Sequence, residues 1–163
     1  MRLYRLLLLV LAIVLVSTVG AAASRGSPQR NFRAHLAAED AGTQTQAQGQ
    51  AVFQFNRDGS EVRFKLIVSN IENVTMAHIH VASTPGANGP PAVWLYPSAP
   101  PAQLIPGRFD GVLAQGKFTA ADLVGSLAGM TLEDLRTAIQ EGRAYVNVHT
   151  SQYPAGEIRG QIH

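Results

Sequence analysis

The feature that most constrains the fold of this chain is a pair of alternating segments that meet at Asp58-Gly59. Apolar and polar residues alternate over residues 51–55 and again over residues 62–68. A period of two places successive side chains on opposite faces of a β-strand. Two such runs joined by Asp-Gly are the strongest short-range signal for a β-hairpin. The centre of the chain therefore predicts an antiparallel sheet with one apolar face.

Further short segments have strand character, and turn residues separate most of them. They cover residues 32–38, 74–81, 92–96, 109–118, 144–149 and 156–162. Residues 42–50 are rich in glutamine and small residues, and they predict a loop. The predicted fold is mainly β: a single antiparallel β-sandwich of seven to eight short strands.

One covering helix near residues 131–141 interrupts the predicted strands. Thr131 can cap its N-terminus, and Gly142 provides a stop. Leu132, Leu135 and Ile139 then share one apolar face. A shorter helical turn is expected within residues 119–127.

The first 23 residues predict an export signal. Arg2 and Arg5 precede eleven unbroken apolar residues at 6–16, and Ala21-Ala22-Ala23 supplies a cleavage pattern before Ser24. The alternative is an uncleaved anchor, because residues 6–23 approach the length of about 20 that spans a bilayer. The predicted organisation is a signal peptide at 1–23, a flexible lead-in at 24–31 and one domain at 32–163, in a secreted (periplasmic or extracellular) protein.

Charge and cysteine content exclude several functional classes. The chain has 13 Lys+Arg and 11 Asp+Glu, but from Ala34 onward 8 basic residues face 11 acidic ones. This balance argues against a nucleic-acid partner, which requires clustered cations. The absence of cysteine excludes disulfides, thiolate zinc sites and cysteine nucleophiles. Ser126 lies in Val124-Gly-Ser-Leu-Ala-Gly129, which does not have the G-x-S-x-G spacing of a nucleophile elbow, so no catalytic residue is predicted.

Three histidines are the one group of residues in the sequence whose spacing suggests a binding site. His78 and His80 share a face of the strand at 74–81, and alternation in the strand at 144–149 also turns His149 away from the core. If the two strands are neighbours, the three imidazoles can cluster, with Asn147, Tyr153 or Glu157 as linking or orienting groups. Three imidazoles can hold copper or zinc. The structural alternative is that these side chains tie loops to strands by hydrogen bonds.

Four motifs in order resemble those of the chordin-type (CHRD) domain family. They are Ala77-His-Ile-His80, Asn88-Gly-Pro90, Tyr145-Val-Asn-Val-His-Thr150 and Pro154-Ala-Gly-Glu-Ile-Arg-Gly-Gln161. The resemblance spans about residues 32–162 and is closest in organisation to exported single-domain members from microbes. It implies a secreted β-rich domain, and it implies no particular chemistry.

Two functional hypotheses follow from these observations. The first is an exported, non-enzymatic CHRD-type domain with a binding or structural role, whose partner is a protein or another component of the cell envelope. The second is a copper- or zinc-binding module that uses His78, His80 and His149. Neither hypothesis includes a nucleic acid, or a membrane contact beyond the signal segment.

Overall fold

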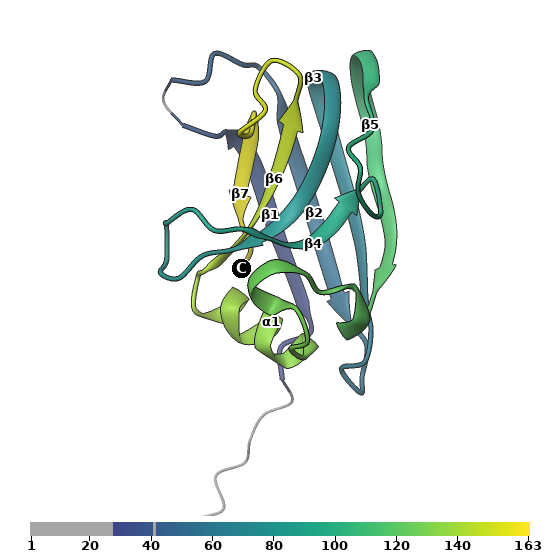
Figure 1. Cartoon of the computed structure of the whole chain (residues 1–163), viewed down its shortest axis with the longest axis vertical. Helices are drawn as coiled ribbons and strands as arrows, with labels where there is room; N and C mark the ends of the chain where they lie inside the picture. Colours follow the sequence, from purple (N-terminus) through teal and green to yellow (C-terminus); the bar gives the residue numbers. More distant parts are fainter. Residues whose placement is uncertain (1–27, 41) are drawn as a thin grey trace, which may run out of the picture.

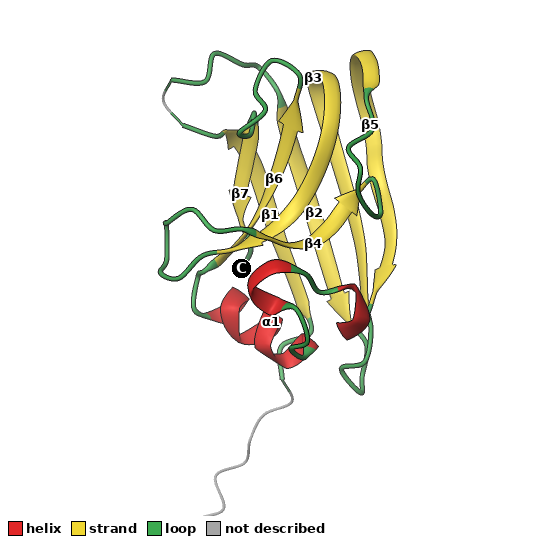
Figure 2. Ribbon diagram, in the orientation of Figure 1, coloured by secondary structure: helices red, strands yellow, loops and turns green. Residues whose placement is uncertain are grey.

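The computed structural model describes residues 28–40 and 42–163, which form a mainly β domain with one α-helix at its lower end in Figures 1 and 2. Its elements are β1 (Asn31–Ala38), β2 (Gln48–Phe55), β3 (Val62–Val81), β4 (Pro91–Tyr96), β5 (Ile105–Phe118), the 3₁₀ helices η1 (Ala120–Asp122) and η2 (Gly125–Leu127), α1 (Leu132–Gln140), β6 (Ala144–Thr150) and β7 (Ile158–Gln161). The predicted signal peptide and residues 24–27 of the lead-in lie outside the described residues. In the described part of the chain, no helix has the length and apolarity needed to cross a membrane.

The predicted hairpin is confirmed. β2 pairs antiparallel with β3 from Phe55↔Val62 to Gln48↔Ser69. In the connecting loop, the Asn56 N–H donates to the Glu61 carbonyl at 2.9 Å. Gly59 has φ +75°, which glycine adopts without steric cost. The predicted loop at 42–50 ends earlier in the structure, because β2 and its pairing with β3 begin at Gln48.

β3 joins two segments that the sequence predicts as separate strands. It runs for 20 residues and bends where Asn70 and Asn73 adopt φ values of +55° and +53°. Asparagine tolerates this left-handed region better than most residues, and both side chains are held, because Asn70 Oδ1 accepts from Arg108 and Asn73 Oδ1 accepts from the Gly107 N–H. The residues before the bend pair with β2, those after it pair with β6 and β4, and β5 pairs with β3 from Val62 through the bend to Val74.

The strands form a closed barrel instead of the expected sandwich. β2, β1, β7, β6 and β3 are neighbours in that order, and the pairing of β2 with β3 closes the ring of five strands. β4 and β5 pair with β3 alone and extend the sheet beyond this ring. The long bent strand explains the difference from the prediction, because one strand provides partners to both ends of the ring.

The barrel interior holds the apolar residues of the alternating strands. Phe55, Leu66 and Ile79 are fully buried there, among a larger cluster of valines, leucines and alanines. The predicted helix is confirmed as α1, and Thr131 forms the N-terminal capping box with Asp134. The predicted turn at 119–127 is present as η1 and η2.

Candidate metal centre

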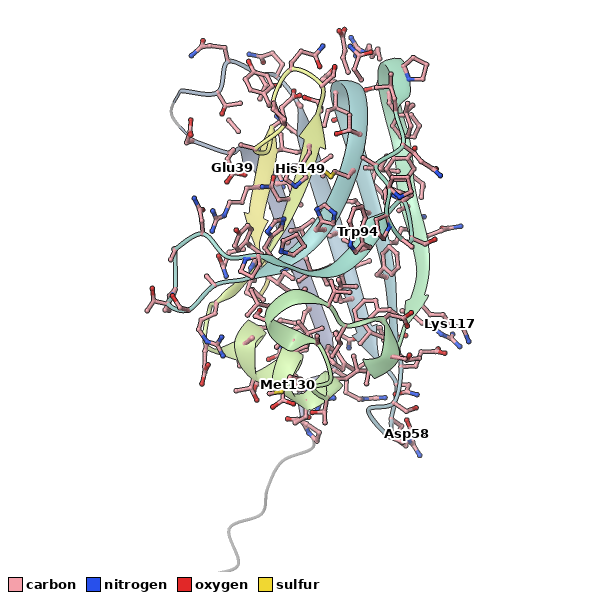
Figure 3. The ribbon with its side chains drawn as sticks, in the orientation of Figure 1. Glu39, Asp58, Trp94, Lys117, Met130 and His149 are labelled. Atoms are coloured by element: carbon pink, nitrogen blue, oxygen red, sulfur yellow. The ribbon has the colours of Figure 1, made fainter. Side chains whose placement is uncertain are left out.

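The predicted neighbourhood of the two histidine-bearing strands is confirmed. β6 pairs antiparallel with the second half of β3, so that His78 lies opposite Asn147 and Met76 lies opposite His149. His78 and His80 are two residues apart and share a face. The register therefore brings His149 diagonally next to His78 on the same sheet, with its side chain labelled near the centre of Figure 3.

The three histidines are buried, contrary to the expectation that they face outward. Their exposed fractions are 2% for His78, 7% for His80 and 5% for His149. Strand β4 pairs with β3 beside them, and the Trp94 ring meets the His78 ring edge-on at a centroid distance of 4.2 Å. Alternation identified the correct side of the strands, but it contains no information about the segments that fold over that side.

The three rings converge on one point. His78 Nδ1 lies 3.3 Å from His149 Nε2, and one ring nitrogen from each of the three histidines lies within 4.8 Å of the others. The ring centroids are 5.2 to 5.7 Å apart. A metal bound by imidazole nitrogens at about 2.1 Å separates them by at most about 4.2 Å, so small ring rotations would bring the three nitrogens to one ion.

Backbone carbonyls fix the orientation of two rings. His80 donates from Nδ1 to the Gly89 carbonyl at 2.8 Å, and His149 donates from Nδ1 to the Pro154 carbonyl at 3.0 Å. A proton on Nδ1 leaves Nε2 of each ring as the unprotonated nitrogen, which is the usual metal-binding arrangement in proteins. His149 Nε2 accepts a hydrogen bond from His78 Nδ1 at 3.3 Å, and a bound ion would replace that hydrogen bond. Among the described residues, the buried Nε2 atoms of His78 and His80 have no hydrogen-bond partner.

Burial keeps the rings neutral. Loss of solvation lowers the pKa of His78 to about 3, with the neighbouring His149 and His80 adding to the shift. Burial likewise lowers the pKa of His149 to about 4 and also lowers the pKa of His80. A neutral imidazole is the form that binds metal, so all three rings are in that form at neutral pH.

The orienting groups predicted from the sequence have other partners. The Asn147 amide donates to the Ala155 carbonyl at 3.3 Å. The Glu157 carboxylate accepts from the Thr45 and Thr150 hydroxyls at 2.6 and 2.7 Å. Tyr153 donates its hydroxyl to the Gln44 carbonyl. The linking roles predicted for these three residues are therefore wrong, and carbonyls that no sequence pattern marks take their place.

Tyr145 and Arg159 support the centre from β6 and β7, in roles that were not predicted from the sequence. The Tyr145 ring stacks on His80 at a centroid distance of 5.0 Å, and the Arg159 guanidinium lies 3.4 Å from the Tyr145 ring centroid. Arg159 also donates to Glu39 and to Asn88. The alternation of β6 could have suggested Tyr145, since it shares the face of His149.

No curated protein and no solved structure matches the chain. The family model of the CHRD domain matches residues 32–162, which include every strand after the first residue of β1, all three histidines and the orienting carbonyls. The predicted resemblance is confirmed over nearly the whole chain, and the protein belongs to the CHRD domain family.

Proposed function

We propose that this CHRD domain is an exported, non-enzymatic protein that binds one copper or zinc ion through His78, His80 and His149. The observation that carries the proposal is the orientation of the rings. His80 and His149 each use Nδ1 on a backbone carbonyl, and this leaves Nε2 as the atom available inside the cluster.

The chemistry of the donor set also fits such an ion. Imidazole suits copper and zinc, and divalent copper binds nitrogen sites more tightly than zinc does. A buried nitrogen without a hydrogen-bond partner costs free energy, and a bound ion would compensate the Nε2 atom of His80. The neutral state of the rings removes competition from protons near neutral pH.

Metal analysis of the full chain, purified without a histidine tag and stripped with a chelator, tests the proposal. Offered copper or zinc, the protein should retain about one equivalent after gel filtration. His80→Gln and His149→Gln should each abolish stoichiometric binding, because each removes a ligand. His35→Gln is the matched control, since His35 is exposed on β1.

The metal content of the unmodified protein and of the three variants either supports the proposed site or overturns it. The proposal is overturned if the unmodified protein retains neither metal, or if His35→Gln loses as much metal as the other two variants. Circular dichroism establishes that the variants fold. If His80→Gln and His149→Gln fold and still hold one equivalent, the assigned ligands are wrong.

Export is part of the same proposal and rests on residues 1–23 of the sequence. Cleavage after Ala23 would give a mature chain that begins at Ser24. N-terminal sequencing of the protein recovered outside the cytoplasm tests this expectation. Exported protein that still begins at Met1 would favour the membrane anchor instead.

A further inference from the structure

A second surface of the domain carries features of a ligand site, away from the histidines. It is the outer face of the sheet formed by β1, β2, the first half of β3 and β5, called here the basic face. The register aligns Arg33, Val52, Lys65 and Gln115 in one row across these four strands. Asn31, Gln54, Arg63 and Lys117 form the adjacent row, and Lys117 is labelled at the lower end of β5 in Figure 3.

Positive charge is concentrated on the basic face. Four of the nine Lys and Arg residues between positions 33 and 163 lie in these two rows, although acidic residues outnumber basic ones from Ala34 onward. Glu61 forms ion pairs with Lys117 at 2.8 Å and with Arg63 at 3.4 Å, at one end of the face. No salt bridge among the described residues involves Arg33 or Lys65, and Arg33 donates from Nε to the His163 ring at 3.4 Å. Neither cation is neutralised by a carboxylate side chain of the described residues, so both are available to an anionic partner.

The basic face is hollowed as well as charged. A groove of about 700 Å³ lies over the parts of the two rows that belong to β1, β2 and β3, and its lining includes Arg33, Arg63, Lys65 and the half-buried Phe64. Its lining contains side-chain amides, including Asn31 and Gln54, but no carboxylate side chain. A groove lined by several cations and by no Asp or Glu side chain attracts and concentrates anions.

The polar and apolar groups between the cations indicate which anion fits. Side-chain amides both donate and accept hydrogen bonds, so they can pair with hydroxyl groups in either sense. Three aliphatic side chains on the face, Val52, Ile67 and Val112, are 41–45% exposed and offer apolar contact area. No aromatic residue is among the large hydrophobic residues that the described chain exposes, whereas stable protein interfaces are enriched in aromatic anchors.

We infer that the basic face binds an acidic polysaccharide. Arg33 and Lys65 pair with its carboxylate or sulfate groups, the amides of Asn31 and Gln54 bond its hydroxyls, and Val52 contacts the C–H faces of its rings. Adjacent strands lie about 4.8 Å apart, so one row offers groups at several successive positions along an extended polymer. This inference is independent of metal binding, because the face uses other strands and other residues.

Binding of the full chain to polygalacturonate and to dextran sulfate, measured by biolayer interferometry at low salt, tests the inference. Arg33→Glu combined with Lys65→Glu should weaken binding by about tenfold or more, because each substitution replaces an attraction with a repulsion. Added salt should weaken binding of the unmodified protein, since exposed charges are screened. The two polymers distinguish a carboxylate from a sulfate as the preferred group.

The control is Arg57→Glu, which makes the same charge reversal as each single substitution, in the exposed β2–β3 loop; it is compared with Arg33→Glu and Lys65→Glu singly as well as with the double variant. It should retain binding. Three results would overturn the inference: failure to bind either polymer, an equal loss in Arg57→Glu and the double variant, or binding to uncharged dextran that matches binding to the acidic polymers. Equal or tighter binding to single-stranded DNA or to phosphatidylglycerol vesicles would also overturn it, by assigning the face to another class of partner.

Discussion

Mild acid should destabilise the metal-free domain, because its buried histidines must take up protons to match the unfolded chain. The pKa of His78 is about 3 and that of His149 about 4, against an ordinary value of 6.5. At pH values between the lowered pKa of each ring and 6.5, the unfolded chain binds more protons than the folded chain does. Folding stability from the two rings is therefore fully present above about pH 6.5 and is lost as the pH falls.

The size of this loss follows from the two pKa values. From about pH 7.5 to about pH 5, proton linkage removes about 2 kcal/mol for one ring and at most about 4 kcal/mol for both. Asp58 and Asp134, whose pKa values are lowered by hydrogen bonds, lose their contributions at more acidic pH. Burial raises the pKa of Glu39, so protonation of Glu39 favours the folded state and acts in the opposite direction.

Urea unfolding with a chelator present, at about pH 7.5 and about pH 5, measures the loss directly. The combined variant His78→Gln and His149→Gln should show a much smaller difference between the two conditions. His35→Gln should behave as the unmodified protein, because His35 is exposed. Equal unfolding free energies at the two pH values, or an undiminished difference in the double variant, would refute the assignment of the effect to buried neutral rings.

Three further substitutions, two of them with a matched control, test the packing and the cap of α1. Val146→Asp should lower the free energy of unfolding by several kcal/mol, because it places a carboxylate at a fully buried site of β6. Val52→Asp, at a valine on β2 that is 45% exposed, should change the free energy of unfolding by about 0.5 kcal/mol or less. Chemical denaturation compares the two variants. Gly89→Ala should destabilise the domain and shift the carbonyl that orients His80, because a Cβ there would lie 2.1 Å from the Val81 carbonyl oxygen. Gly116→Ala meets only ordinary contacts and should leave the melting temperature nearly unchanged. Thr131→Ala should cost about 1 kcal/mol in the same denaturation assay by removing the cap of α1.

Local elements were predictable because short-range chemistry determines them. The Asp58-Gly59 hairpin depends on alternation and a turn, and α1 depends on Thr131 at its start and Gly142 at its end. Closure of the barrel depends on long-range pairing between β1 and β7, which leaves no pattern in either strand. The sequence therefore predicted the strands better than the arrangement of the sheet.

The candidate site was predictable in part for the same reason. Strand alternation and neighbouring strands were sufficient to bring His78, His80 and His149 together. Their burial depends on β4 and on the loops that contain Gly89 and Pro154, and their orientation depends on main-chain carbonyls of those loops. Every residue has a main-chain carbonyl, so no residue type in the sequence identifies the carbonyls that orient His80 and His149.

The pairing of β1 with β7 has a consequence for the order in which the chain can fold. β1 lies between β2, its neighbour in sequence, and β7, which is paired through Ala37↔Arg159 and Ala38↔Ile158. A chain that emerges from a ribosome or a translocation channel from its N-terminus cannot close the ring until residues 158–161 have emerged. Until then β1 and β6 each present an unpaired strand edge, which is a template for aggregation. Ring closure over so long a sequence separation is also intrinsically slow. On the proposal that the protein is exported, the domain should therefore cross the membrane unfolded and complete its fold only after β7 is released.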